Sequence, residues 1–354
     1  MTRNSDALHF AVPGALDQPT GGYRYGLRIV EALRRSGRAV VVHELAGSHP
    51  EPDPRAREAA KACLAAAAGA ALVIDGLALP AFEGLLGASP ARTLALIHHP
   101  LALETGIGEA ARRRFAELEP TLLAACRGAL VTSPATATAL LTMGVRASRI
   151  AVIVPAIDRR AAGTRRAGGA VRLLCVASLT PRKGHRVLLA ALARLRGRRW
   201  RLLCIGPGDR DPAENARVRM AARVRGLARR VRFPGALPAE RVAAAYAAAE
   251  LFVLPSFHEG YGMAFAEAIA TGLPVIGARV GAVPATIPAG AGLLVRPGDS
   301  RALARTLAAL LDRRDRRARL ARGATSAARR FPDWNAQAAR FAAAVDRLAG
   351  EAKA

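Results

Sequence analysis

A regular alternation of short apolar segments with longer helical stretches constrains the fold of this chain most. In the first half the apolar segments are Leu8–Pro13, Val40–His43, Ala71–Ile74, Thr93–His98, Gly128–Thr132 and Ile150–Val154. In the second half they are Val171–Val176, Arg201–Ile205, Arg229–Phe233, Leu251–Leu254, Pro274–Gly277 and Gly292–Val295. Continuous apolar runs of this length are typical of strands buried on both faces. Strands that alternate with helices therefore predict an α/β fold with parallel sheets and helices on both faces.

The alternation is interrupted once, between Pro155 and Gly169, where the sequence is polar and rich in small residues. Such a segment is typical of a linker, and 354 residues are about twice the usual length of one domain. We therefore expect two doubly wound, Rossmann-like domains facing each other across a cleft. The first covers residues 1–157, the linker residues 158–169 and the second residues 170–334. We expect the C-terminal helix, about residues 335–354, to pack back on the first domain.

The net charge of +26 allows two interpretations. A balance so basic suggests nucleic acid, an anionic membrane or polyphosphate ligands. Arginine and alanine dominate the sequence while lysine is rare, which equally indicates a compositional bias of the coding sequence. The main basic cluster is Arg217–Arg232. Because aromatic residues make up only 4% of the chain, platforms for stacking bases are scarce, and we expect no nucleic-acid partner.

Four cysteines stand alone in the sequence, at Cys63, Cys126, Cys175 and Cys204. No CxxC pair or clustered His/Cys spacing accompanies them, so we expect reduced core residues and no zinc site. The sequence also shows no apolar run long enough to span a membrane and no secretory signal. These features predict a cytoplasmic protein. Peripheral association with the anionic inner face of a membrane is a further hypothesis, which the positive charge suggests.

Two glutamates, Glu259 and Glu267, flank a pair of glycines in the segment Pro255–Ile276, "PSFHEGYGMAFAEAIATGLPVI". The segment follows the apolar strand Leu251–Leu254, and helix-forming residues resume at Met263. This order predicts that Glu259 lies in the loop at the carboxyl end of a parallel strand and that Glu267 lies about one turn into the next helix. Ligands of doubly wound sheets bind beyond such strand ends.

The start of this predicted helix has the properties of an anion site. The backbone amides of Gly262, Met263 and Ala264 have no partner within the helix, and together with the helix dipole they favour an anion. Glu267 is suited to hydrogen-bond the paired hydroxyls of a ribose, and Glu259 is suited to orient a sugar. Either glutamate alone is better explained by dipole compensation or by solvation. Their combination with the glycines indicates a nucleotide-sugar site.

The same stretch resembles the E-x7-E signature of the family 4 retaining glycosyltransferases, which have the GT-B fold. Three further segments resemble that family in order and spacing. They are Val131–Asp158, "VTSPATATALLTMGVRASRIAVIVPAID", Val176–Leu192, "VASLTPRKGHRVLLAAL", and Gly272–Ile287, "GLPVIGARVGAVPATI". The likeness extends through nearly the whole chain, and it implies a GT-B fold and the transfer of a sugar with retention of its anomeric configuration.

The resemblance assigns a role to the basic loop around Lys183. In the family a lysine at this position neutralises the diphosphate, whose charge grows as the glycosidic bond breaks. An arginine in a G-R-L pattern shares the task there, but Ala177-Ser178-Leu179 replaces that pattern here. Arg182 is a candidate substitute, although a solvated turn explains it equally well.

The resemblance also implies roles for residues of the first domain. Gly21 and Gly22 resemble the family's N-terminal glycine loop, whose amides approach the diphosphate or the acceptor. A plain tight turn over Pro19–Tyr23 is the alternative. His98 matches a histidine that hydrogen-bonds the donor sugar in the family.

We therefore expect a retaining hexosyltransferase that moves a hexose from a nucleotide-diphosphate sugar to a hydroxyl of a glycan, lipid-linked or small-molecule acceptor, as in polysaccharide biosynthesis. The predicted catalytic residues are Glu259, His98 and Lys183. The predicted donor-binding residues are Glu267, Arg182, Gly262, Met263, Ala264, Gly21 and Gly22. No cofactor or required metal is expected, because an arginine interrupts the D-x-D spacing of Asp209 and Asp211, which we interpret as a solvated loop.

Two alternative functions are consistent with the sequence. One is a metal-dependent transferase that uses Asp209 and Asp211. The other is a basic protein that binds nucleic acid or a membrane surface and keeps the fold without transferase activity.

Overall fold

A computed structural model describes residues 7–18, 20–87, 89, 91–104, 107–158 and 169–350 of the chain. The chain divides into two compact units. Unit 1 comprises Met1–Ala156 together with Pro332–Ala354, and unit 2 comprises Ile157–Phe331. Most of the expected linker, residues 159–168, lies outside the described residues. In the part of the chain that the structure describes, no helix is both long enough and apolar enough to cross a membrane.

Unit 1 is built on a six-stranded parallel sheet with the order β2-β1-β3-β4-β5-β6. Its strands are β1 (Leu8–Pro13), β2 (Val40–Leu45), β3 (Ala71–Asp75), β4 (Arg92–Ile97), β5 (Gly128–Val131) and β6 (Ile150–Val152). Its helices are α1 (Gly21–Arg35), α2 (Pro54–Ala66), α3 (Glu109–Ala125), α4 (Pro134–Thr142) and α12 (Trp334–Gly350), with the 3-10 turns η2 (Leu79–Phe82), η3 (Leu101–Leu103) and η4 (Ala147–Arg149). The strands β1, β3 and β5 are buried along their whole length, as strands covered by helices on both faces must be.

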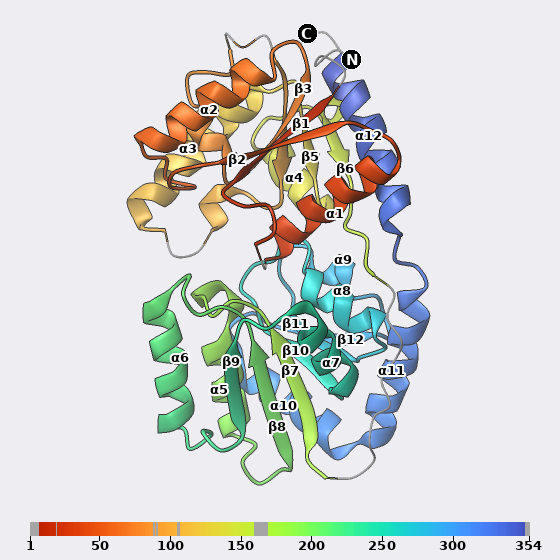
Figure 1. Cartoon of the computed structure of the whole chain (residues 1–354). Helices are drawn as coiled ribbons and strands as arrows, with labels where there is room; N and C mark the ends of the chain where they lie inside the picture. Colours follow the sequence, from red (N-terminus) through yellow and green to blue (C-terminus); the bar gives the residue numbers. More distant parts are fainter. Residues whose placement is uncertain are drawn as a thin grey trace. The chain divides into compact units, whose positions relative to one another are not determined.

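The last helix, α12, belongs to unit 1. It packs against α1, beside which it lies in Figure 1, and against the sheet strands β3, β4 and β5. The ring centroid of Phe341 lies 6.3 Å from that of Phe10 in β1, and the rings of Trp334 and Tyr25 are 6.2 Å apart. The C-terminal segment therefore completes a core whose other side chains come from the N-terminal part of the chain.

Unit 2 contains a second six-stranded parallel sheet, with the order β12-β11-β10-β7-β8-β9. Its strands are β7 (Val171–Val176), β8 (Trp200–Ile205), β9 (Val231–Gly235), β10 (Leu251–Leu254), β11 (Val275–Ala278) and β12 (Gly292–Val295). Its helices are α5 (His185–Ala193), α6 (Pro212–Val224), α7 (Ala239–Ala248), α8 (Met263–Ala270), α9 (Val283–Thr286), α10 (Ser300–Asp312) and α11 (Arg314–Ala328), with the 3-10 turn η5 (Pro181–Lys183). The prediction of two doubly wound α/β domains is confirmed.

The basic cluster Arg217–Arg232 is divided among α6, the turn after it and the start of β9. Two of its arginines cover aromatic rings. The guanidinium carbon of Arg219 lies 5.4 Å from the ring centroid of Phe233, and that of Arg230 lies 4.7 Å from the ring of Trp200. Stacking of this kind is favourable for arginine. Part of the positive charge therefore has a structural use.

A buried carboxyl group supports the loop that follows β4. Glu119 of α3 is fully buried, and its Oε2 accepts a hydrogen bond of 3.0 Å from the backbone N–H of Leu101 in η3. The other oxygen, Oε1, has no partner among the described residues. Burial raises the pKa of Glu119 to about 7, against the opposing effect of the Leu101 N–H. The ionised form of this side chain is therefore unfavourable in the folded protein.

We predict that Glu119→Gln alters the pH dependence of stability. The folded protein holds a proton that the unfolded chain releases, so the wild type loses stability as the pH rises from 4.5 to about 7, by at most ~3 kcal/mol. Glutamine has no charge to bury. The melting temperature of the variant relative to the wild type should therefore be higher at about pH 8 than at about pH 4.

Glu117→Gln is the matched control, because Glu117 is an exposed residue of the same helix. It should leave the difference in melting temperature independent of pH. A pH-independent difference for the Glu119 variant would contradict the buried, proton-holding carboxyl group.

Candidate functional site

The candidate donor site lies at the topological switch point of unit 2. The strands β7 and β10 are neighbours in the sheet. The chain runs outward from β7 to β8 and β9 in one direction, and from β10 to β11 and β12 in the other. Ligands of open α/β sheets bind outside the carboxyl ends of the strands at such a point. The loop after β7 carries Arg182 and Lys183, and the loop after β10 carries Glu259 and leads into α8.

The carboxylate of Glu259 joins these two loops. Lys183 Nζ lies 2.7 Å from its Oε1, and the Ser256 hydroxyl donates to the same oxygen at 2.6 Å. The guanidinium of Arg182 lies 3.9 Å from Oε2. The side chain of Glu259 is 8% exposed, and those of Lys183 and Arg182 are each 14% exposed. The structure thus brings together three residues that the sequence places in separate loops.

The electrostatics of this cluster keep Glu259 ionised. Burial raises the pKa of Glu259, but the charges of Lys183 and Arg182 and the hydrogen bonds from Lys183 and Ser256 outweigh burial and hold the pKa below its ordinary value. The carboxylate is therefore paired and charged at neutral pH. Because the pair is buried, removal of one partner leaves the other charge uncompensated.

Backbone contacts fix the two loops against each other. The N–H of Phe257 donates to the carbonyl oxygen of Arg182 at 2.7 Å, and the Arg182 side chain donates to the carbonyl of His258 at 3.3 Å. Gly184 has a φ of +68°, and a Cβ at this position would lie 2.2 Å from the carbonyl oxygen of Pro255. Only glycine permits both this conformation and this approach.

The helix α8 starts at Met263, as predicted. Its N-cap is Gly262, with φ 92° and ψ 52°, and no side chain caps the described helix. The first helical amides have no acceptor within the helix, so those of Met263 and Ala264 remain available for an anion. Glu267 lies in the same helix and is 8% exposed. These positions match the predicted arrangement, while the binding roles of the residues stay predictions.

In unit 1 the structure orients His98 through an aspartate. His98 follows β4, and its Nε2 lies 3.1 Å from Oδ2 of Asp75 at the end of β3. A carboxylate oxygen of Asp75 accepts when Nε2 carries a proton, so this contact fixes the orientation of the ring. The ring of Tyr25 meets the imidazole edge-on, with centroids 5.7 Å apart. A Cβ at Gly22 would lie 3.2 Å from the imidazole, so Gly22 and His98 are neighbours.

The two N-terminal glycines are part of a helix, which corrects the expectation of a glycine turn. Gly21 and Gly22 are the first residues of α1, after the extended N-cap residue Thr20, and neither has a positive φ. The helix extends this far because Tyr25 and Ile29 are buried on one face and set its period. The amides of Gly21 and Gly22 are therefore helix N-terminal amides, a setting that still favours an anion.

Sequence reasoning does not identify two supporting residues, Asp75 and Ser256. A signal exists for Asp75, since a single acid ends the otherwise apolar strand Ala71–Asp75. A serine after a strand is common, so Ser256 has no such signal. The structure also explains Asp211 of the D-x-D spacing, whose Oδ1 accepts from the N–H of Glu214 at 2.8 Å and caps α6.

All four cysteines are free and buried, as expected, but two of them are neighbours in the fold. Cys175 in β7 and Cys204 in β8 are paired in register on neighbouring strands. His185 of α5 joins them, and the three side chains form one buried group. The two cysteines are far apart in the sequence, so the sequence does not show that they are neighbours. The pairing of β7 with β8 brings them together.

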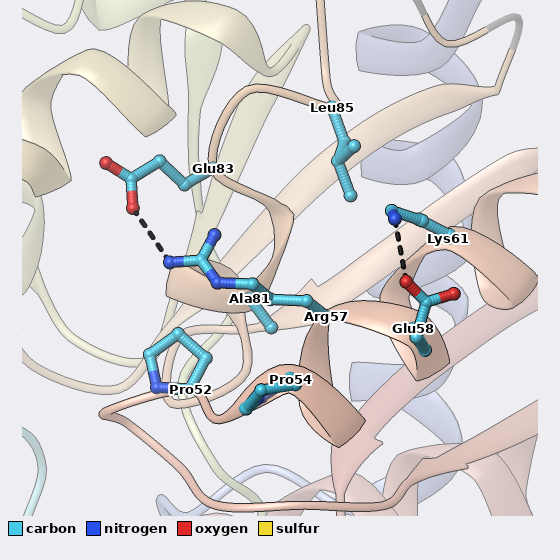
Figure 2. A pocket seen from close by; sticks show the side chains of 8 residues that line it. All are labelled: Pro52, Pro54, Arg57, Glu58, Lys61, Ala81, Glu83 and Leu85. Carbon is cyan, nitrogen blue, oxygen red and sulfur yellow. Dashed lines mark hydrogen bonds and ion pairs between the residues drawn. The ribbon is translucent and has the colours of Figure 1, made fainter.

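A pocket in unit 1 is distinct from the candidate site (Figure 2). It is lined by Pro52, Pro54, Arg57, Glu58, Lys61, Ala81, Glu83 and Leu85. Arg57 pairs with Glu83 at 3.5 Å, and Lys61 pairs with Glu58 at 2.7 Å (Figure 2). None of the predicted site residues lines this pocket, and its charges pair with one another.

Two doubly wound domains in one chain define the GT-B class of fold. The model of the family described as Glycosyl transferases group 1 matches residues 170–313. The matched part holds the predicted residues of unit 2, from Arg182 to Glu267. Residues 170–313 of this chain are therefore similar to that family.

Curated relatives are similar over about half of the chain. The D-inositol 3-phosphate glycosyltransferase of Corynebacterium efficiens is 37% identical over 199 residues, which cover 53% of this chain and 46% of the relative. The D-inositol 3-phosphate glycosyltransferase 2 of Catenulispora acidiphila is 35% identical over 214 residues, which cover 55% of this chain and 50% of the relative. The chain thus spans about half the length of the curated relatives it matches.

Solved structures are similar over nearly the whole chain. Sucrose-phosphate synthase from Thermosynechococcus elongatus has a TM-score of 0.82 at 22% identity, covering 96% of this chain and 98% of that one. Anabaena HepE in complex with UDP and glucose has a TM-score of 0.74 at 17% identity, covering 95% and 98%. At such identities the likeness concerns the fold, and it confirms the predicted GT-B fold class.

We predict that Gly184→Ala destabilises unit 2 by displacing the Lys183 loop from Pro255. The matched control is Gly226→Ala, because Gly226 has a φ of +67° but meets its nearest atom, Arg196 Nη1, only at 3.7 Å. Both variants carry the cost of a positive φ, ~1 kcal/mol, and only Gly184→Ala adds a clash with backbone. Its loss of unfolding free energy should exceed that of the control by ~2 kcal/mol. Equal losses in denaturant titrations would contradict the close approach.

Proposed function

We propose that this chain is a retaining glycosyltransferase that moves a hexose from a nucleotide-diphosphate sugar to a hydroxyl group of an acceptor. The proposal depends mainly on one observation. Lys183 and Glu259 form an ion pair at the switch point of unit 2, where helix α8 also begins without a side-chain cap. The family match over residues 170–313 supports the proposal, because it covers this ion pair and the start of α8.

The diphosphate binds at the start of α8 in this proposal. The amides of Met263 and Ala264 and the helix dipole receive one phosphate, and Gly262 leaves the backbone open to it. Lys183 and Arg182 contribute positive charge beside the same loop. These groups stabilise the negative charge that develops on the leaving diphosphate, and for this reason the proposal requires no metal ion.

The two glutamates hold the sugar ends of the donor. Glu267 accepts hydrogen bonds from the ribose hydroxyls, and Glu259 orients the transferred hexose. The ionised state of Glu259 suits this role, because a carboxylate accepts hydrogen bonds from two hydroxyls at once. Its ion pair with Lys183 keeps the carboxylate fixed before the donor binds.

Unit 1 provides the acceptor side and a second contact to the donor in this proposal. His98 hydrogen-bonds the transferred sugar, and its hydrogen bond with Asp75 fixes the ring orientation. The N-terminal amides of Gly21 and Gly22 approach the diphosphate or the acceptor. The acceptor is a glycan, a lipid-linked molecule or a small molecule that bears a free hydroxyl.

The transfer step breaks the bond from the anomeric carbon to the diphosphate oxygen. A bond from the same carbon to the acceptor oxygen forms on the same face of the sugar, so the configuration is retained. The proton of the acceptor hydroxyl passes to the leaving phosphate oxygen. The likeness to the E-x7-E signature supports retention, and the fixed positive groups around the phosphate supply the electrostatic stabilisation that such a step needs.

The comparisons suggest which ligands to test first. Anabaena HepE has been crystallised with UDP and with UDP-glucose, so UDP-sugars are the first donors to screen, followed by GDP- and ADP-sugars. The curated relatives are named D-inositol 3-phosphate glycosyltransferases, so inositol phosphates are the first acceptors to screen. Only the positive charge suggests membrane association, and we leave it out of the proposed function.

We predict that Lys183→Ala lowers the rate of UDP release from a UDP-sugar by about 100- to 1000-fold, the usual effect of losing one preorganised group that stabilises a developing oxyanion. The matched control is Lys61→Ala, since Lys61 is an exposed lysine that pairs with Glu58 in unit 1. That variant should turn over at the wild-type rate. Near-normal turnover by folded Lys183→Ala would refute the assigned role.

We predict that Glu267→Gln weakens the binding of the nucleotide itself. Loss of a charge-assisted hydrogen-bond pair should raise the Kd for UDP, measured by calorimetry, about 10- to 100-fold. Glu240→Gln is the control, because Glu240 is an exposed residue of α7. An unchanged Kd for the Glu267 variant would show that this glutamate does not hold the ribose.

A further inference from the structure

Three buried side chains in unit 2 offer ligand atoms to a common point. They are Cys175 in β7, Cys204 in β8 and His185, the first residue of α5. Their ligating atoms all lie within 4.8 Å of one another. The side chains are 0%, 1% and 2% exposed. The rest of this core cluster consists of aliphatic and aromatic side chains, so three potential metal ligands stand out within it.

The sheet register explains how the cluster arises. Cys175 and Cys204 are direct partners on neighbouring parallel strands, so their side chains project from the same face of the sheet. The loop after β7 then returns the chain to that face at His185. The cluster is thus built by β7, β8 and the start of α5, three elements of one rigid α/β unit.

The geometry fits a tetrahedral metal ion. The Cys175 Sγ and the His185 Nε2 are 3.6 Å apart. Zinc binds sulfur at about 2.3 Å and imidazole nitrogen at about 2.1 Å. A separation of 3.6 Å then corresponds to an angle of about 110° at the metal, which is close to the tetrahedral value for these bond lengths.

The charge state of the cluster also fits a cation. A thiolate is the form of cysteine that binds metal. Two thiolates and one divalent ion have no net charge together. Burial of the complete site therefore carries no cost for an uncompensated charge.

We propose that Cys175, Cys204 and His185 form a structural site for one zinc ion in unit 2. Binding converts the two thiols into thiolates, forms two zinc–sulfur bonds and one zinc–nitrogen bond, and releases the thiol protons to solvent. A water molecule retained by the ion would fill the fourth position of the tetrahedron. The proposal stands apart from the glycosyltransferase proposal, since it uses none of the donor-binding residues.

The position of the site gives the ion a stabilising role. His185 follows Gly184 directly, and Gly184 follows Lys183. A zinc ion on His185 would therefore connect the end of the Lys183 loop to the neighbouring strands β7 and β8. Because the ligands are buried, no substrate reaches the metal, and we assign it no part in the chemistry of transfer.

The test uses the whole wild-type protein, purified from cells supplied with zinc and, separately, with cobalt. We expect one equivalent of zinc per chain by elemental analysis after gel filtration. The cobalt-loaded protein should show a sulfur-to-cobalt charge-transfer band and the intense visible bands of a tetrahedral site. Absence of bound metal together with absence of these bands would overturn the proposal, whatever the behaviour of any variant.

Variants assign the ligands. Cys175→Ala and Cys204→Ala should each lower zinc affinity more than about tenfold, since even a partner of a ligand contributes ~10- to 100-fold. The matched controls are Cys63→Ala and Cys126→Ala, which remove buried cysteines of unit 1. The controls should keep one equivalent of zinc and the cobalt spectrum. Loss of metal from the controls alone would place the site elsewhere and overturn the assignment.

A thiol count separates the metal site from a cross-strand disulfide. All four cysteines are free thiols in the structure, so denatured, unreduced protein with a chelator should react as four thiols. Two reactive thiols would indicate a disulfide between Cys175 and Cys204 and would overturn the proposal. Circular dichroism of each variant shows whether it folds, and the wild-type cobalt spectrum decides the question if one does not.

Discussion

The buried ion pair of Lys183 and Glu259 is the interaction on which the candidate site depends. Glu259 is almost inaccessible to water, and the lysine, the nearby Arg182 and the Ser256 hydroxyl compensate its charge. A buried pair of this kind contributes little net stability, but loss of one partner costs about 3 to 5 kcal/mol. The pair therefore forces the loops after β7 and β10 to stay together, and this contact defines the site before any ligand binds.

The parallel sheet makes this contact possible. Neighbouring parallel strands β7 and β10 end at the same edge, so the loops that follow them start side by side, and the chain then leaves them in opposite directions. The same short connection, from Lys183 through Gly184 to His185, joins the charged loop to the buried cysteine pair. Gly184, which has a positive φ, thus connects the charged loop of unit 2 to the buried cysteines. The close approach of Gly184 to Pro255 restricts the conformation of this connection.

Much of the fold could be predicted because buried parallel strands have a local signature. The apolar runs Leu8–Pro13, Val171–Val176 and Leu251–Leu254 coincide with β1, β7 and β10, and the start of α8 was evident from Gly262 and the helix formers after it. The prediction was wrong about where two of the elements begin. The glycines at the start of α1 are helical because buried residues later in that helix extend it, and β9 begins at Val231 rather than Arg229.

The sequence by itself determined the two α/β domains, the loop position of Glu259, the helical position of Glu267 and the basic loop with Lys183. These depend on local patterns of apolar, charged and glycine residues. Only the tertiary structure decided that Lys183 and Glu259 form a pair, that Asp75 orients His98, and that Cys175, Cys204 and His185 meet. The physical reason is that strand order and register set which distant residues become neighbours, and neither is encoded in any short stretch of chain.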